Sequence, residues 1–197
     1  MQPSSPTNDA TAQSAIIWPA RYLPGTTSNF TSNETVAADL SASQIWPLLA
    51  DITQWQTYYP NCAHITPPAS GPILQKGATF HFSTFGFPVL EAHVREAVAP
   101  ERGQPGRLAW SAALEGGEDE AVDVYHAWLV EDLPGGRVRV LTQESQVGKP
   151  AAELASRRPN VMLLGHQDWL DGLVTAARGG RVVKEETNLA KTGLLAY

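Results

Sequence analysis

The sequence predicts an α+β fold in which a curved antiparallel sheet of about seven strands wraps around one long C-terminal helix. From residue 62 onward, apolar residues recur with a period of two along successive segments joined by short turns, which is typical of an antiparallel meander. Residues 162–177 carry a single apolar stripe of helical period. Two short helical segments separate the first strand from the meander, and this order suits a sheet that closes on one helix.

The first predicted elements are a strand and two short helices. Residues 33–40 alternate between two faces, which predicts a half-buried strand. Ser41 and Gln44 have the spacing of a capping box, so a helix should begin there, and Pro47 past its first turn should make it irregular. Residues 51–60 predict a second short helix that Pro60 ends.

The meander and the long helix complete the predicted domain. Pro159 is expected to kink or restart the helix, and Gly179 to close it. The strands are predicted at residues 62–66, 78–85, 89–98, 107–114, 121–130 and 137–147. The chain then divides into an N-terminal extension (1–32), a core domain (33–178) and a C-terminal tail (179–197).

Composition and charge exclude several classes of protein. The 197 residues are 43% hydrophobic and carry a net charge of −6, which fits one packed core. No basic block is present, so the sequence predicts neither a nucleic-acid partner nor insertion into a membrane. Cys62 is the one cysteine in the sequence, which excludes a disulfide framework within the chain and a Cys-rich zinc site.

The N-terminal extension predicts a cytoplasmic protein. Residues 1–14 are rich in Ser, Thr, Pro, Asn and Gln, which is typical of a disordered segment. The apolar run 15–18 ends at Pro19 and is too short for a signal peptide or a membrane span. A Pro- and Gly-rich stretch then carries aromatic and apolar residues and is expected to lie against the domain as a strap: Trp18, Tyr22, Leu23 and Phe30. A homodimer is one way to cover this strap.

Five short motifs accompany this order of elements: Trp46–Asp51, Trp55–Pro60, Thr84–Pro88, His126–Val130 and His166–Leu170. Together they resemble the START/SRPBCC superfamily, and most closely its bacterial polyketide-cyclase-like and activator-of-chaperone-like proteins. The resemblance covers roughly residues 30–178 and implies a helix-grip fold with an apolar cavity between sheet and long helix. Members include lipid and sterol carriers, aromatase/cyclases, plant hormone receptors and co-chaperone domains, so the fold alone selects no function.

Polar residues on faces that otherwise face the interior are the candidates for catalysis. His126 and Glu144 lie on inward faces of predicted strands, and His166 lies in the apolar stripe of the long helix. If they converge, a His–carboxylate pair can act as general base toward an enolisable carbonyl. Each also fits a structural role, the histidines as hydrogen-bonded core residues and Glu144 as a solvated edge residue.

Other side chains are candidates for lining the cavity, with Tyr58 and Tyr59 expected at its mouth. The same residues also fit plain core packing. The candidates are Trp110, Trp128, Trp169, Phe80, Phe82, Tyr58, Tyr59, Thr142 and Met162. Phosphate loops, nucleophile elbows, His-Glu-x-x-His and Cys-x-x-Cys motifs are absent from the sequence, so no metal or nucleotide cofactor is predicted.

Three functions follow from these observations. The first is binding of a small hydrophobic molecule, lipid-like or polycyclic and polyketide-like, in the internal cavity. The second is a cyclase- or dehydratase-type enzyme, a lyase or isomerase that uses His126, His166 and Glu144 as acid and base. The third is a co-chaperone-like domain that docks a partner protein through the sheet or the strap. A cavity with room for only a few waters would exclude the first two.

Overall fold

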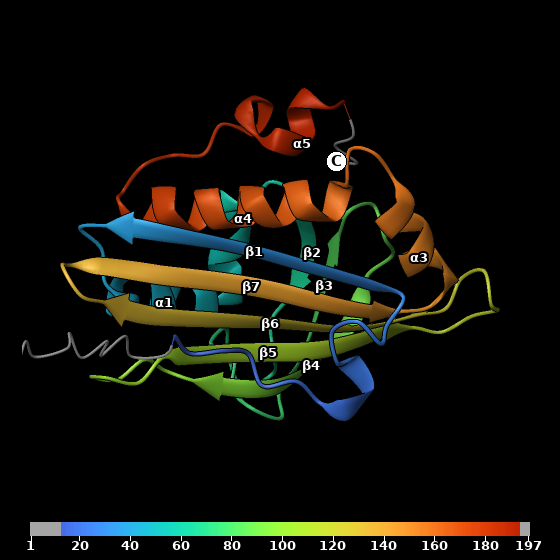
Figure 1. Cartoon of the computed structure of the whole chain (residues 1–197), viewed down its shortest axis with the longest axis horizontal. Coiled ribbons are helices and arrows are strands. Elements are labelled where there is room, and N and C mark those ends of the chain that lie inside the picture. The colour runs from blue at the N-terminus through green and yellow to red at the C-terminus, as the bar shows by residue number, and fades with distance from the viewer. Residues whose placement is uncertain (1–12, 194–197) are drawn as a thin grey trace, which may run out of the picture.

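A seven-stranded antiparallel sheet is the frame of the structure, a computed structural model that describes residues 13–193 (Figure 1). The segment predicted to be disordered lies almost entirely outside these residues. The strands run in the order β1-β7-β6-β5-β4-β3-β2, so the meander is continuous and the first strand joins its last. Their bounds are β1 (Asn29–Ala38), β2 (Cys62–Thr66), β3 (Thr79–Thr84), β4 (Leu90–Val98), β5 (Gly106–Leu114), β6 (Val122–Leu133) and β7 (Arg137–Val147).

The sheet curves around the long helix, which confirms the predicted fold class (Figure 1). This helix, α4, contacts β1 and β7 at one side and the short helices α1 and α2 at the other. The α-helices are α1 (Ala42–Ala50), α2 (Trp55–Tyr58), α3 (Lys149–Ser156), α4 (Val161–Ala177) and α5 (Asn188–Lys191). Short 3₁₀ segments are η1 (Ala20–Tyr22), η2 (Ile52–Gln54) and η3 (Lys184–Glu186).

The start of the domain differs from its prediction in one respect. β1 begins at Asn29 rather than at residue 33 and pairs with β7 along its whole length. Its inward positions Asn29 and Thr31 are buried but polar, so apolar alternation gives no signal there. The capping box is present, with the backbone N–H of Ser41 donating to Gln44 Oε1 at 3.0 Å.

The core between the sheet and α4 is a cluster of aromatic rings. Trp55 meets Trp110 and Trp169 at ring-centroid distances of 5.4 and 5.1 Å, and all three are buried. Tyr59 stacks on Trp169 at 4.3 Å. Such contacts bury large apolar surfaces and fix the distance between helix and sheet.

Tyr58 and Tyr59 are not at a cavity mouth as expected, because both are fully buried in this core. The Tyr58 hydroxyl donates to the Leu48 carbonyl at 3.0 Å. Gly172 brings α4 against the same segment, since a Cβ at Gly172 would clash with the Tyr58 carbonyl oxygen. Burial raises the pKa of both phenols, so they serve as neutral core groups.

The predicted strap lies against the outer face of the sheet, as the blue segment in front of the strands shows (Figure 1). Trp18 and Tyr22 pack on Tyr125 of β6, with ring centroids 5.7 and 5.3 Å apart. The Tyr22 hydroxyl donates to Asp123 Oδ1 at 2.6 Å, and burial raises its pKa to about 12. None of the helices described is long and apolar enough to cross a membrane.

Three elements of the C-terminal third were not predicted: α3, η3 and α5. α3 is a short helix with proline in its first turn, placed between β7 and α4. Beyond residue 179, η3 and α5 fold back over α4. The buried Asp168 of α4 holds α5 there, because its carboxylate accepts hydrogen bonds from the backbone N–H groups of Asn188 and Leu189 at 2.6 and 2.9 Å.

Candidate functional site

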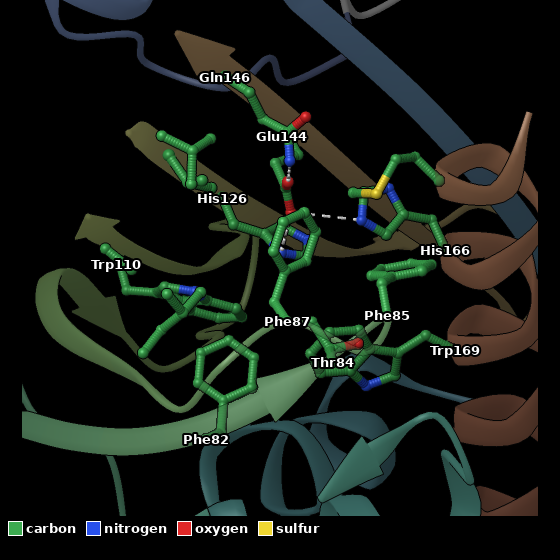
Figure 2. A pocket seen from close by; sticks show the side chains of 15 residues that line it. Phe82, Thr84, Phe85, Phe87, Trp110, His126, Glu144, Gln146, His166 and Trp169 are labelled. Atoms are coloured by element: carbon green, nitrogen blue, oxygen red, sulfur yellow. Dashed lines mark hydrogen bonds and ion pairs between the residues drawn. The ribbon is translucent and has the colours of Figure 1, made fainter. Parts of the chain in front are cut away.

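A small pocket lies between the sheet and α4, at the end of the sheet where the β3–β4 turn covers it (Figure 2). The space open to the centres of water molecules is about 30 Å³, enough for about two waters. Most of its wall is apolar, and its polar groups gather on one side. The lining residues are Phe82, Thr84, Phe85, Phe87, Leu90, Trp110, Ala112, Val122, Val124, His126, Glu144, Gln146, Met162, His166 and Trp169.

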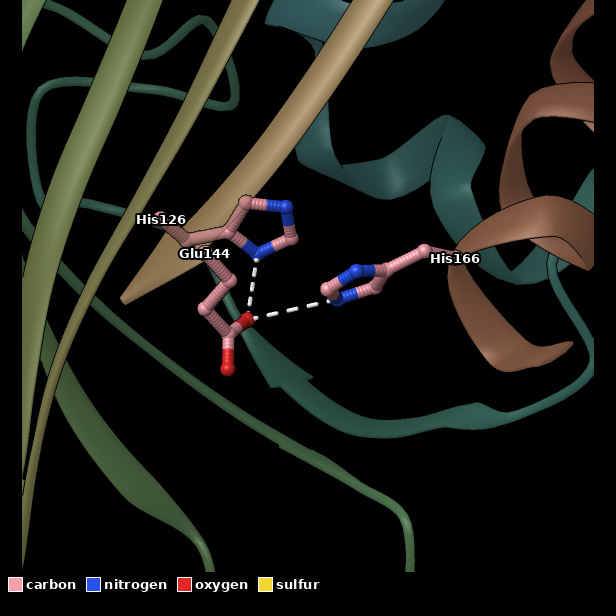
Figure 3. A group of neighbouring side chains, drawn as sticks. All are labelled: His126, Glu144 and His166. Atoms are coloured by element: carbon pink, nitrogen blue, oxygen red, sulfur yellow. Dashed lines mark ion pairs between the residues drawn. The ribbon is translucent and has the colours of Figure 1, made fainter. Parts of the chain in front are cut away.

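The three predicted catalytic candidates meet in this pocket, and we call them the buried trio: His126, Glu144 and His166 (Figure 3). Antiparallel pairing places His126 of β6 directly opposite Glu144 of β7. His126 Nδ1 is 2.9 Å from Glu144 Oε2, and His166 Nε2, reaching across from α4, is 3.4 Å from the same oxygen. All three side chains are almost completely buried.

Neighbouring side chains contact the atoms of the buried trio that face away from Glu144 Oε2. His126 Nε2 is 2.7 Å from Thr142 Oγ1, and His166 Nδ1 is 3.1 Å from Thr31 Oγ1. Glu144 Oε1 accepts from Gln146 Nε2 at 2.5 Å, and Gln146 Oε1 in turn accepts from Asn29 Nδ2 at 2.8 Å. These four neighbours are themselves buried, so they fix the orientation of each ring and of the carboxylate.

The environment sets the charge of the trio. Burial lowers the pKa of His126 below its ordinary value, and the carboxylate of Glu144 opposes this shift only in part. Burial also acts to raise the pKa of Glu144, but the charge interaction and hydrogen bond with His126, together with the nearby His166 imidazole, outweigh it and hold that pKa well below its ordinary value. The site therefore presents an ionised carboxylate beside a neutral His126 at neutral pH.

One nitrogen of the trio has no hydrogen-bond partner among the described residues. His166 Nε2 is buried, and its 3.4 Å contact with Glu144 lacks hydrogen-bond geometry. Both nitrogens of His126, by contrast, are engaged by Glu144 and Thr142. His166 Nε2 is thus the ring atom of the trio that is available to a bound group.

The structure separates the predicted lining residues into two groups. Four of them line the pocket: Trp110, Trp169, Phe82 and Met162. The others lie behind the wall and pack in the core or support the trio: Trp128, Phe80, Tyr58, Tyr59 and Thr142. The strand residues among them all lie on inward faces, which supply both core and pocket, so the position along each strand decides between the two roles.

Several residues of the site were missed. Gln146 lies two positions after Glu144 on the same face, and this spacing was the available signal. Thr31 and Asn29 precede the predicted strand. Phe85 and Phe87 come from the β3–β4 turn, and the tight packing of Phe85 against α4 depends on Gly165, where a Cβ would clash with the phenyl ring.

A second group of the same composition lies on the surface, and we call it the exposed trio: His81, Glu91 and His93. His81 Nε2 and His93 Nε2 are each 3.3 Å from a different oxygen of Glu91. The side chains are 40%, 57% and 44% exposed, respectively. His93 Nδ1 is 3.1 Å from Thr79 Oγ1. About half of the surface of these side chains is therefore exposed to solvent.

Comparison with solved structures identifies related proteins. The hypothetical protein jhp0584 from Helicobacter pylori is 46% identical, with a TM-score of 0.80 over 85% of this chain and 99% of that one. Norcoclaurine synthase from Thalictrum flavum has the same fold at 12% identity, with a TM-score of 0.55 over 77% of this chain and 94% of that one.

The di-domain ARO/CYC protein BexL also shares the fold, at 11% identity and a TM-score of 0.52, over 74% of this chain and 45% of that one. No protein-family model and no curated protein matches the chain. With the curled sheet, the long α4 and the pocket between them, these likenesses settle the classification. The chain has the helix-grip fold, as the distant structures do, and it belongs to the same family as the Helicobacter pylori protein jhp0584.

Proposed function

We propose that the protein binds a small, mainly apolar molecule that carries one polar group, in the pocket between the sheet and α4. The observation that carries the proposal is the arrangement of the pocket wall, which is apolar except for the side formed by the buried trio and Gln146. A pocket with an apolar body and a few fixed polar groups is suited to such a ligand. His166 Nε2 would orient its carbonyl or hydroxyl group, since that nitrogen lacks another partner among the described residues.

The size of the pocket limits the ligand. With about 30 Å³ open to water centres, the conformation described here has no room for a lipid-like or polycyclic molecule. Room for only a few waters was expected to exclude both hydrophobic-ligand binding and the cyclase-type enzyme, and the conformation described here has no more room than that. The proposal therefore requires that larger ligands displace the cover formed by Phe85 and Phe87.

The β3–β4 turn is suited to act as this cover. Phe85 and Gly86 both have positive φ, at 55° and 75°, and a bulky residue in the left-handed region is strained. Phe85 and Phe87 pack on apolar side chains of α3, α4 and α5 rather than entering the sheet. Moving this turn would open the pocket without breaking the pairing of β3 with β4.

A titration with two aromatic alcohols tests the proposal. Phenol and 2-naphthol are added to ¹⁵N-labelled full-length protein, and chemical shifts are followed by NMR. We expect both probes to perturb the trio in Phe85→Ala/Phe87→Ala, and 2-naphthol to bind about tenfold tighter to that variant than to the wild type. Val89→Ala, at an exposed position next to the turn and outside the pocket lining, is the matched control. The proposal fails if neither probe perturbs the pocket in the wild type or in the double variant.

A second candidate is an acid–base enzyme of cyclase or dehydratase type. The observation that favours it is the His–carboxylate geometry of the trio, at 2.9 and 3.4 Å. His166 Nε2 would take a proton from a carbon next to a carbonyl, and the Glu144 carboxylate would stabilise the imidazolium formed. His166→Asn should then abolish turnover of a test polyketide, while the circular dichroism spectrum stays unchanged. Turnover unaffected by that substitution rejects this candidate.

The predicted cytoplasmic location remains part of this proposal, and the homodimer stays a prediction with less to support it. A dimer was expected because the strap needs a surface to pack on, and Trp18 and Tyr22 find that surface on Tyr125 of their own chain. The same packing gives no support to docking of a partner protein through the strap. Light scattering of the full chain is expected to give the mass of a monomer.

A further inference from the structure

We infer that the buried trio is a binding site for a divalent first-row transition-metal ion, with His126 Nδ1, Glu144 Oε2 and His166 Nε2 as its three protein ligands. Two imidazoles and one carboxylate are a donor set that binds Zn²⁺ and Fe²⁺ in proteins. The inference does not depend on the organic ligand proposed above.

The separations between the candidate ligand atoms fit a tetrahedral site. Bonds of 2.0–2.2 Å to a central ion place neighbouring ligand atoms about 3.3 Å apart. The carboxylate oxygen is 2.9 Å from His126 Nδ1 and 3.4 Å from His166 Nε2, close to this value. One ligand atom from each of the three residues lies within 4.8 Å of the others, so the two imidazoles would have to approach each other when an ion binds.

The convergence involves separate elements rather than one local motif. His126 comes from β6, Glu144 from β7 and His166 from α4, and Figure 3 shows both imidazoles directed at the same carboxylate oxygen. Because the three side chains are fixed by the sheet register and by helix packing, the site is formed before an ion binds.

The neighbours of the trio act as supports of the kind that metal sites have. A metal-bound histidine donates through its other nitrogen, and a ligating carboxylate is itself hydrogen-bonded. Here the outer nitrogen of each imidazole meets a threonine, Thr142 or Thr31, and the outer carboxylate oxygen accepts from Gln146. The two imidazole nitrogens and the carboxylate oxygen that face away from the centre of the trio thus all have a partner. The three candidate ligand atoms, which face the centre, remain to bind an ion.

Two further observations point to a cation. His166 Nε2 is buried without a hydrogen-bond partner among the described residues, and it is directed at the carboxylate. The pocket lining contains the negative charge of Glu144 but no Lys or Arg within the part of the chain that is described. A buried carboxylate with no Lys or Arg beside it, facing a nitrogen without a hydrogen-bond partner, is suited to bind a divalent ion.

The pocket also leaves a position for a fourth ligand. Its open space of about 30 Å³ accommodates about two waters, which suits an ion with one bound water. A site with three protein ligands and an open position is typical of catalytic rather than structural zinc. A ligand that carries a carbonyl or hydroxyl group would replace that water.

Titration with metal alone tests the inference. Full-length protein is stripped with a chelator, and Zn²⁺ or Co²⁺ is added during isothermal titration calorimetry, with visible absorption of Co²⁺ as a second readout. We expect one ion per chain. His166→Asn removes a ligand and should weaken metal binding by at least about 100-fold. Removal of a side chain that only hydrogen-bonds a ligand weakens binding by about 10–100-fold. Thr31→Val leaves all three ligands in place and should weaken metal binding by about tenfold. This variant still tests the site if His166→Asn does not fold.

The exposed trio supplies the matched control. The double variant His81→Asn/His93→Asn removes two surface imidazoles that also flank a carboxylate, each at a different oxygen, and it should leave the tight site unchanged. The inference is overturned if stripped wild-type protein binds neither ion, or if binding survives His166→Asn and Thr31→Val and is lost in the surface variant. Because the probes are ions alone, failure of the phenol titration would leave this result standing, and the reverse is also true.

Discussion

The buried and exposed trios contain the same residue types in nearly the same local arrangement. In each, a histidine and a glutamate lie directly opposite each other on neighbouring antiparallel strands, His126 with Glu144 and His81 with Glu91. In each, a second histidine lies 3.3–3.4 Å from the carboxylate, and a threonine contacts one imidazole. They differ in where the second histidine comes from, a helix across the pocket in one case and the same strand in the other.

This difference shows that environment, rather than composition, makes the candidate site. Water and salt reach the exposed trio, so its ion pairs are weak and can be replaced by hydrogen bonds to water. In the buried trio each polar atom depends on a protein partner, because water is largely excluded and an unpaired group is costly. A sequence pattern of two histidines and a glutamate therefore indicates little until the face on which it lies is known.

Removing the carboxylate should give the largest contrast. Glu144→Gln places an amide between two buried imidazoles and leaves mismatched donors, so we expect a loss of about 3 kcal/mol in the free energy of unfolding. Glu91→Gln should change it by less than about 0.5 kcal/mol. Urea denaturation of the metal-free protein measures both. Equal losses in the two variants would show that burial does not distinguish the trios.

Lowering the pH should remove the contribution of the buried Glu144 carboxylate to the free energy of unfolding. The pKa of Glu144 is lowered on folding, so its contribution to stability is present above the ordinary value of 4.5 and is lost as the pH falls through the lower folded value. The pKa of His126 is also lowered, so protonation of the unfolded chain destabilises the fold as the pH drops below 6.5. The difference between wild type and Glu144→Gln should shrink progressively below about pH 5. A difference that stays constant down to pH 3 would contradict these directions.

The sequence was sufficient to predict the fold because its strongest signals are local. The predicted bounds of β7, 137–147, are those observed, and the apolar stripe of α4 was predicted to within one residue of its start. Alternation also placed His126 and Glu144 on inward faces, and the helical stripe did the same for His166. The meander order then follows from short turns, since consecutive antiparallel strands pair with one another.

The rest of the site depends on long-range packing that local patterns do not contain. Asn29 and Thr31 fill inward positions with polar groups, so they break the alternation that would have revealed them. The size of the pocket is limited by Phe85 and Phe87, which lie in the β3–β4 turn. The positive φ values of this turn could not be predicted from the sequence pattern. α3 was missed because eight residues give too few turns of helix for a periodic signal.

The threonines that contact each trio offer a smaller contrast. Thr142→Val keeps the shape of a buried strand residue but leaves His126 Nε2 without its partner at 2.7 Å, and we expect a loss of about 1–2 kcal/mol. Thr79→Val removes the corresponding contact with His93, where water replaces it, and should cost less than about 0.5 kcal/mol. Both values come from urea denaturation. A larger effect at Thr79 would mean that the exposed trio, too, relies on its protein neighbours.

Salt should produce the smallest effect and the one most specific to the surface. At 1 M ionic strength the screening length is about 3 Å, so ion pairs in contact with solvent lose most of their attraction. Any stability difference between wild type and Glu91→Gln should therefore vanish between low salt and 1 M NaCl. The difference for Glu144→Gln should persist, because ions do not reach a side chain only 8% exposed within the pocket wall. Thermal unfolding at the two salt concentrations measures both differences. If the Glu144 difference fell in parallel with the Glu91 difference, solvent would have access to the pocket, and the contrast between the two trios would be one of degree.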